Sequence, residues 1–119
     1  KLAHKLYAGA DIFLMPSRYE PCGLSQMIAM RYGTVPIARA TGGLADTIRH
    51  ISHKVNGGTG FLFDRPFPSV FASTLRRAIR FYQNSEVWQQ IQKNGMAIDF
   101  SWKNSAQKYI DMYKSLLNE

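Results

Sequence analysis

The sequence lacks the features that mark several common protein classes. A single cysteine, Cys22, excludes an internal disulfide framework, and no cysteines and histidines stand at zinc-ligand spacing, so we expect no metal site and a reducing compartment. The longest apolar runs, such as 12–15, span a few residues, whereas a membrane helix needs about 20. No charged segment precedes an apolar one as in a signal peptide. We therefore expect a soluble chain with no membrane partner.

Acidic residues are scarce, since 8 Asp and Glu stand against 15 Lys and Arg and the formal net charge is +7. The basic residues are spread along the chain, and Arg76, Arg77 and Arg80 form the only dense group. The apolar residues of that segment recur on one helical face, which leaves these arginines largely on a solvated face. This distribution argues against a nucleic-acid partner and suits attraction of anionic small molecules such as nucleotide sugars.

The remaining composition is that of a globular domain. The 119 residues allow one domain at most, and 45% hydrophobic residues are enough for a core. Apolar runs at 12–15, 35–38 and 61–63 predict strands, and the first two are of the kind buried on both faces. They alternate with helical segments, which indicates βαβ units and an α/β fold with a parallel sheet. Three strands make only half of a Rossmann-like lobe.

Helices are predicted around these strands and after them. An opening helix closes at Gly9, and a second runs over 24–32 to a C-cap at Gly33. The turn 41–43 precedes a short helix over 44–48, and three helices follow at 68–82, about 85–94 and 102–117, the last with Ser101 as N-cap. Pro36 counts against a central, fully paired position for the strand 35–38.

Two loops that follow strands carry the candidate chemistry. In the first, Glu20 comes just before a helix and Gly23 allows close approach of the backbone, so amides of residues 22–25 are placed to face an anion. The second is the turn 41–43, which we expect beside the first at one edge of the sheet. An alternative is that Glu20 only complements its helix dipole, with Pro21 in the first turn. The glycine cluster 57–60 precedes a strand and is interpreted as a turn.

Several segments, in this order and at this spacing, resemble the bacterial glycogen synthases and plant starch synthases, glycosyltransferase family 5. The segments are 8–11, 17–26, 29–36, 41–47, 58–61 and 100–102. The resemblance implies the GT-B fold, which has two Rossmann-like lobes. Residues 1–119 would be part of the C-terminal nucleotide-sugar-binding lobe, without the N-terminal lobe, and the final helix would reach back toward that first lobe.

The same resemblance implies transfer of glucose from ADP-glucose to the non-reducing end of an α-1,4-glucan with retention, without a cofactor. It implies a cytoplasmic location in bacteria or the plastid stroma in plants. The family's diphosphate-gripping Arg and Lys would lie upstream of Lys1, and neither Arg18 nor Arg39 is expected to replace them. The fragment alone is therefore expected to be inactive.

The resemblance gives each loop residue a role. Glu20 would be the catalytic carboxylate at the donor glucose, with a backbone wall at residues 22–24 and the Ser25 hydroxyl near the ribose or diphosphate. The expected donor-binding residues are Glu20, Cys22, Gly23, Leu24, Ser25, Thr41, Gly42 and Gly43. Cys22 has no neighbouring histidine that would make it a nucleophile. The histidines His4, His50 and His53 are expected at the surface.

Two alternatives to a glucan synthase remain at this stage. Another GT-B transferase using a different nucleotide sugar is disfavoured, because relatives with broader donor range often carry a second Glu eight positions after the first, where this chain has Ile28. A non-catalytic nucleotide- or glycan-binding module is the other alternative.

Overall fold

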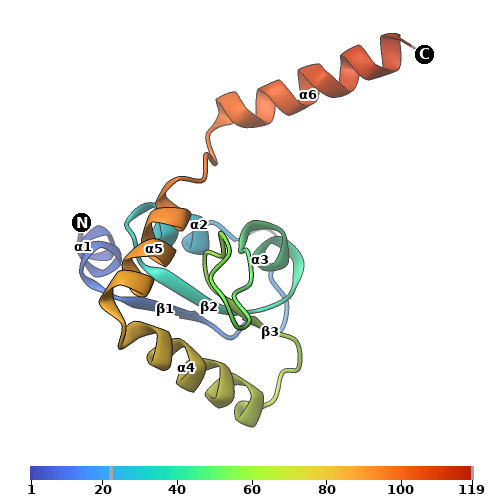
Figure 1. Cartoon of the computed structure of the whole chain (residues 1–119). Helices are drawn as coiled ribbons and strands as arrows, with labels where there is room; N and C mark the ends of the chain where they lie inside the picture. The colour runs from blue at the N-terminus through green and yellow to red at the C-terminus, as the bar shows by residue number, and fades with distance from the viewer. Residues whose placement is uncertain (22, 119) are drawn as a thin grey trace.

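The computed structural model of the chain describes residues 1–21 and 23–118 and has an α/β architecture (Figure 1). The elements are α1 (Leu2–Gly9), β1 (Ile12–Met15), α2 (Ser25–Arg31), β2 (Val35–Arg39), α3 (Gly42–Thr47), β3 (Phe61–Phe63), α4 (Pro68–Tyr82), α5 (Ser85–Met96) and α6 (Trp102–Leu117). The three strands form one parallel sheet in the order β1-β2-β3. The predicted parallel half-sheet followed by helices is confirmed.

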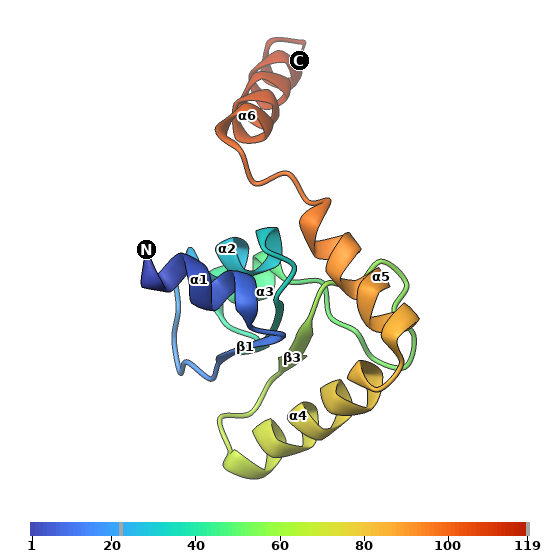
Figure 2. The same ribbon diagram turned by 90° about the vertical axis from the view of Figure 1, so that its left-hand side faces the viewer.

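Helices cover both faces of this sheet, and each face has its own core (Figure 2). On one side α4 and α5 pack on alternate strand residues such as Ile37 and Phe61. On the other side α2 and α3 pack on the residues between them, including Ala38 and Leu62. The period-2 alternation of strand side chains therefore explains why these strands are apolar throughout.

The prediction that Pro36 keeps its strand from a central position is wrong, because β2 lies between β1 and β3. The amide of Val35 donates to the Asp11 carbonyl on the β1 side, so strand alternation turns the Pro36 nitrogen toward β3. Pairing with β3 begins only at Ile37 and Phe61, one residue later. Proline thus stands where pairing with β3 has not yet begun, so its missing amide hydrogen costs no ladder bond.

The expected burial of β1 on both faces is also wrong. This strand is at the edge of the sheet, and Leu14 is 46% exposed, whereas the central strand is buried from Val35 to Ala38. The apolar character of β1 is that of an interior strand, and the described chain supplies it with a neighbour on one side only.

Glycine ends α2 as predicted. Gly33 has φ +83° and its amide donates to the Met30 carbonyl, while the Thr34 amide donates to the Ala29 carbonyl, which is a Schellman motif.

Two helix boundaries differ from expectation. Helix α3 starts at Gly42 rather than after the glycines, and α5 continues through Gly95, which is buried against Met30.

Helix α6 projects away from the rest of the molecule (Figures 1 and 2). Its start is capped as predicted, because the Ser101 hydroxyl accepts the Asn104 amide, and Asp99 accepts the Ser101 amide. The bonds to Ser101 lower the pKa of Asp99. No described residue of α6 is buried, and its apolar residues, including Trp102 at 88%, are exposed.

Two basic residues expected on the surface have structural contacts. Arg77 is half-buried with its guanidinium carbon 5.7 Å from the centre of the Phe61 ring, and burial followed by repulsion from Arg80 lowers its pKa. The Nδ1 atom of His50 accepts the Leu62 amide at 2.9 Å, next to a parallel bridge between His50 and Gly60 at the edge of the sheet. His50 is nevertheless exposed, as are His4 and His53, and this confirms the expected surface positions.

Candidate functional site

The two candidate loops meet at the carboxyl ends of β1 and β2. The amide of Gly43, in the first turn of α3, donates to the carbonyls of Glu20 and Pro21 at 3.0 and 3.1 Å. These bonds join the loop that leaves β1 to the turn that leaves β2. The expectation that the loops lie side by side at one sheet edge is confirmed.

Gly42 is required by this contact. Its φ is +46°, and a Cβ placed there would clash with the main-chain oxygen of Glu20 and lie 3.1 Å from the Cα of Pro21. The residue therefore meets both conditions that favour glycine, a left-handed backbone and close approach of another chain segment.

The carboxylate of Glu20 is available for a ligand. The side chain is half-buried, and within residues 1–21 and 23–118 its carboxylate has no hydrogen-bond or ion-pair partner. Glu20 lies outside the first turn of α2, which begins at Ser25 with Leu24 as its N-cap and has no acidic residue. Pro21 is likewise outside that turn.

The far end of the β1–α2 loop is held by a buried glutamine. The Gln26 Nε2 atom donates to the Gly23 carbonyl at 3.0 Å and to the Thr47 hydroxyl at 3.1 Å. That hydroxyl in turn donates to the Gly43 carbonyl at 2.6 Å. Gly23 has φ +66°, and a Cβ there would lie 3.0 Å from the Glu20 Cγ atom, so the glycine makes room for the glutamate.

The near end of the loop is held by Arg39, the last residue of β2. Its Nε donates to the Ser17 carbonyl at 3.0 Å, Nη2 donates to the Arg18 carbonyl, and Nη1 donates to the Asp64 carbonyl at 3.1 Å. We call these three bonds the Arg39 clasp. Sequence reasoning did not find this role, or that of Gln26 and Thr47. A glutamine on the otherwise apolar inner face of α2 was the one signal present.

The other predicted donor-binding residues are placed as follows. Ser25 is the first residue of α2 and Thr41 is the N-cap of α3, and neither hydroxyl bonds to another described residue. Leu24 is 66% exposed. Cys22 lies outside the described residues.

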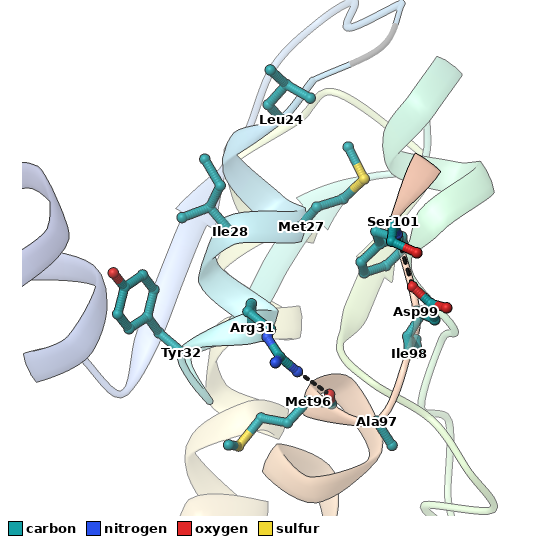
Figure 3. A pocket seen from close by; sticks show the side chains of 11 residues that line it. Leu24, Met27, Ile28, Arg31, Tyr32, Met96, Ala97, Ile98, Asp99 and Ser101 are labelled. Atoms are coloured by element: carbon teal, nitrogen blue, oxygen red, sulfur yellow. Dashed lines mark hydrogen bonds between the residues drawn. The ribbon is translucent and has the colours of Figure 1, made fainter. Parts of the chain in front are cut away.

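Leu24 also lines an apolar cavity of about 680 Å³ between α2 and the segment that follows α5 (Figure 3). Met27 and Ile28 of α2 and its C-cap Tyr32 are among the residues that line it, and the guanidinium of Arg31 donates to the Met96 carbonyl at 3.2 Å. This cavity is separate from the loop contact around Glu20, whose residues do not line it.

Two features are absent from the described residues. They contain no cluster of three or more His, Cys, Asp or Glu side chains arranged to hold a metal ion. No helix among them has the length and apolar character needed to cross a bilayer.

A parallel sheet with paired loops at its carboxyl edge is the ligand-binding arrangement of doubly wound α/β proteins. The family model described as "Glycosyl transferases group 1" matches residues 2–96. The chain belongs to this family of glycosyltransferases.

Within it, the predicted resemblance to glycogen and starch synthases is confirmed. The chain is 55% identical over 116 residues to the glycogen synthase of Desulforamulus reducens and 50% identical over 117 residues to that of Kosmotoga olearia, matching 98% of its own length in both cases. These matches cover 24% and 25% of the two relatives, so the chain spans about a quarter of their length.

Solved structures agree with this. The catalytic domain of starch synthase IV from Arabidopsis thaliana, bound to ADP and acarbose, superposes with a TM-score of 0.85 at 42% identity, over 99% of this chain and 25% of that one. Sucrose-phosphate synthase from Thermosynechococcus elongatus superposes with a TM-score of 0.66 at 30% identity, over 94% of this chain and 27% of that one.

Proposed function

We propose that this chain is part of a glycogen or starch synthase that transfers glucose from ADP-glucose to the non-reducing end of an α-1,4-glucan with retention. The observation that carries the proposal is identity of about one residue in two to glycogen synthases along nearly the whole chain. The ADP in the starch synthase IV structure supports an adenine nucleotide donor. In bacteria we place the enzyme in the cytoplasm, and in plants in the plastid stroma.

We assign the donor glucose to Glu20. Breaking the bond between glucose and phosphate builds positive charge on the sugar ring, and a carboxylate fixed beside the ring stabilises that charge. Glu20 suits this role because its carboxylate has no partner among the described residues while its main chain is held by Gly43. Gly23, Leu24 and Ser25 then follow along the donor, with the turn at 41–43 opposite.

We place the chain in the second, C-terminal lobe of a GT-B enzyme. The apolar β1 has an open edge and an exposed Leu14, which suits further parallel strands of the same lobe. The exposed apolar face of α6, with Trp102 and Tyr109, suits packing against the other lobe. The cations that grip the diphosphate would come from outside this chain.

The test is Glu20→Gln in the full-length enzyme. We expect kcat to fall by roughly 10²-fold or more, with a much smaller rise in KM for ADP-glucose, because the carboxylate acts as charge develops. Glu86→Gln is the matched control, since Glu86 lies in the first turn of α5 and complements a helix dipole. That control should lower stability by about 0.3–1 kcal/mol and leave kcat unchanged. A folded Glu20→Gln enzyme with normal kcat would remove Glu20 from the site.

A transferase that uses a different nucleotide sugar is the alternative, and sucrose-phosphate synthase is a structural neighbour that is not named as a glucan synthase. Its likeness is weaker in both identity and TM-score than that of starch synthase IV. Position 28, eight residues after Glu20, is an isoleucine on α2 that lines the apolar cavity. Steady-state kinetics with ADP-glucose and UDP-glucose on the same preparation would decide, and we expect kcat/KM to favour ADP-glucose.

A further inference from the structure

The side chain of Arg39 stands where all three strands end. It leaves the carboxyl end of the central strand β2 and reaches the chain that leaves β1, at Ser17 and Arg18, and the chain that leaves β3, at Asp64. A guanidinium is planar and its five N–H groups point in fixed directions. Bonds to three separate carbonyls therefore define where each segment lies relative to β2.

These bonds commit three of the five N–H groups of Arg39 to the protein's own main chain. Its nitrogens Nε, Nη1 and Nη2 each donate to a main-chain oxygen, and the side chain is half-buried. A cation engaged in this way supports protein backbone, whereas a diphosphate-gripping arginine presents a free fork of donors. Arg39 therefore lies at the sheet edge where ligand-binding residues are found, but its hydrogen bonds hold the protein's own main chain.

Glu20 lies between two fixed points of the same loop. On one side the Arg39 clasp holds the carbonyls of Ser17 and Arg18, and on the other the Gly43 amide holds the carbonyls of Glu20 and Pro21. Releasing the clasp frees the segment before Glu20 while leaving the Gly43 contact in place. We expect the direction of the Glu20 carboxylate to change while the Gly43 contact still holds the loop.

We infer that Arg39 is a positioning residue that sets the geometry of Glu20 through the main chain of residues 17 and 18. The inference rests on the proposed function, in which Glu20 acts on the donor glucose. Displacement of a reacting group by about 1 Å is enough to cost around 10²-fold in rate. Donor binding depends on many other contacts and is less affected.

The experiment measures kcat and KM for ADP-glucose in the full-length enzyme carrying Arg39→Met. We expect kcat to fall by about 30- to 100-fold and KM to change by less than about threefold. Arg65→Gln is the charge-matched control, because Arg65 is exposed near the same sheet edge and makes no hydrogen bond to another described residue. It should remain within about twofold of the parent enzyme. Normal kcat in folded Arg39→Met would overturn the inference.

Arg39→Lys distinguishes an effect of hydrogen-bond geometry from an effect of charge. It also provides a second test of the inference if Arg39→Met does not fold. A single ammonium keeps the charge but cannot reach three carbonyls in the directions of the fork. We expect kcat to stay at least about tenfold low. Recovery of the full rate by lysine would show that charge alone matters and would overturn the inference.

A double-mutant cycle with Glu20→Gln distinguishes this inference from the proposed function. If Arg39 acts through Glu20, adding Arg39→Met to Glu20→Gln lowers kcat by less than about threefold further. Additive losses would show that Arg39 acts elsewhere and would overturn this inference alone. A normal kcat in Glu20→Gln by itself would instead overturn the proposed role of Glu20, and this inference with it.

Discussion

At the scale of single residues, Gly42 tests the contact between the two loops. Gly42→Ala adds a methyl group against the Glu20 carbonyl at a backbone with φ +46°, so the loop must move or the fold is strained. We expect a loss of stability of roughly 2–4 kcal/mol, together with reduced activity of the full-length enzyme. Chemical denaturation and steady-state kinetics on the same preparation measure both effects.

Gly57 supplies the matched control. Its φ is +79°, yet a Cβ placed there meets nothing within 4 Å. Gly57→Ala therefore carries the backbone strain without the clash, at a cost of roughly 1–2 kcal/mol and with kcat unchanged. Equal losses in the two variants would mean that the contact of Gly42 with Glu20 contributes nothing beyond its own backbone conformation.

The sequence predicted part of the site at this scale. The closeness of Glu20 to the 41–43 turn could be predicted, because the carboxyl ends of parallel strands lie at one edge of a sheet. The roles of Arg39 and Gln26 could not. Their partners are main-chain carbonyls and one threonine hydroxyl, and a carbonyl is the same in every residue, so it leaves no pattern in the sequence.

At the scale of elements, the edge of β3 makes stability depend on pH. His50 accepts the Leu62 amide, and burial and the Arg77 cation lower its pKa below the ordinary 6.5, against a smaller opposing effect of Asp64. As the pH falls below about 6.5 the unfolded chain takes up this proton before the folded chain does, so the free energy of unfolding decreases. The loss levels off once the pH is below the folded pKa.

His50→Gln is the corresponding variant, because its side-chain oxygen still offers an acceptor to Leu62 without titrating. We expect the fall in urea midpoint between pH 7 and pH 5 to be smaller in His50→Gln than in the parent chain. His53→Gln, on an exposed neighbouring position, should leave the fall unchanged. An identical pH dependence in parent and His50→Gln would contradict the role given to His50.

Helix α6 gives a second prediction about an element. Because none of its described residues is buried, removing residues 101–119 should leave the thermal midpoint of the remaining chain within about 2 °C. The variant should also be more soluble, since the exposed aromatic and aliphatic face of α6 is lost. Circular dichroism measures the thermal midpoint. A large fall in this midpoint would show that α6 stabilises the rest of the fold.

The elements themselves were largely predictable, and the errors have a common cause. Strands 12–15, 35–38 and 61–63 and helices 68–82 and 102–117 follow from apolar runs and amphipathic spacing, and the structure confirms them. The predictions that β1 is buried on both faces and that Pro36 keeps its strand from a central position were wrong. Both depend on which strands are neighbours and where pairing starts, and periodicity within a strand carries neither.

At the scale of the whole molecule, the 119-residue chain spans about a quarter of its glycogen synthase relatives. We predict that this polypeptide by itself transfers no glucose from ADP-glucose to glycogen, because the proposed function places the diphosphate-binding cations and most of the acceptor surface in the rest of the enzyme. Incorporation of radiolabelled glucose into precipitated glycogen is the measurement. Elongation above the level of a Glu20→Gln sample would contradict the prediction.

The Arg39 clasp has a consequence for how this site tolerates variation. It binds main-chain oxygens of Ser17, Arg18 and Asp64 and none of their side chains. Because every residue carries a main-chain carbonyl, substitutions of these three side chains leave the acceptors of the Arg39 clasp in place. We therefore expect side-chain changes at these three positions to preserve the main-chain support of Glu20, whatever polarity they bring to the surrounding surface.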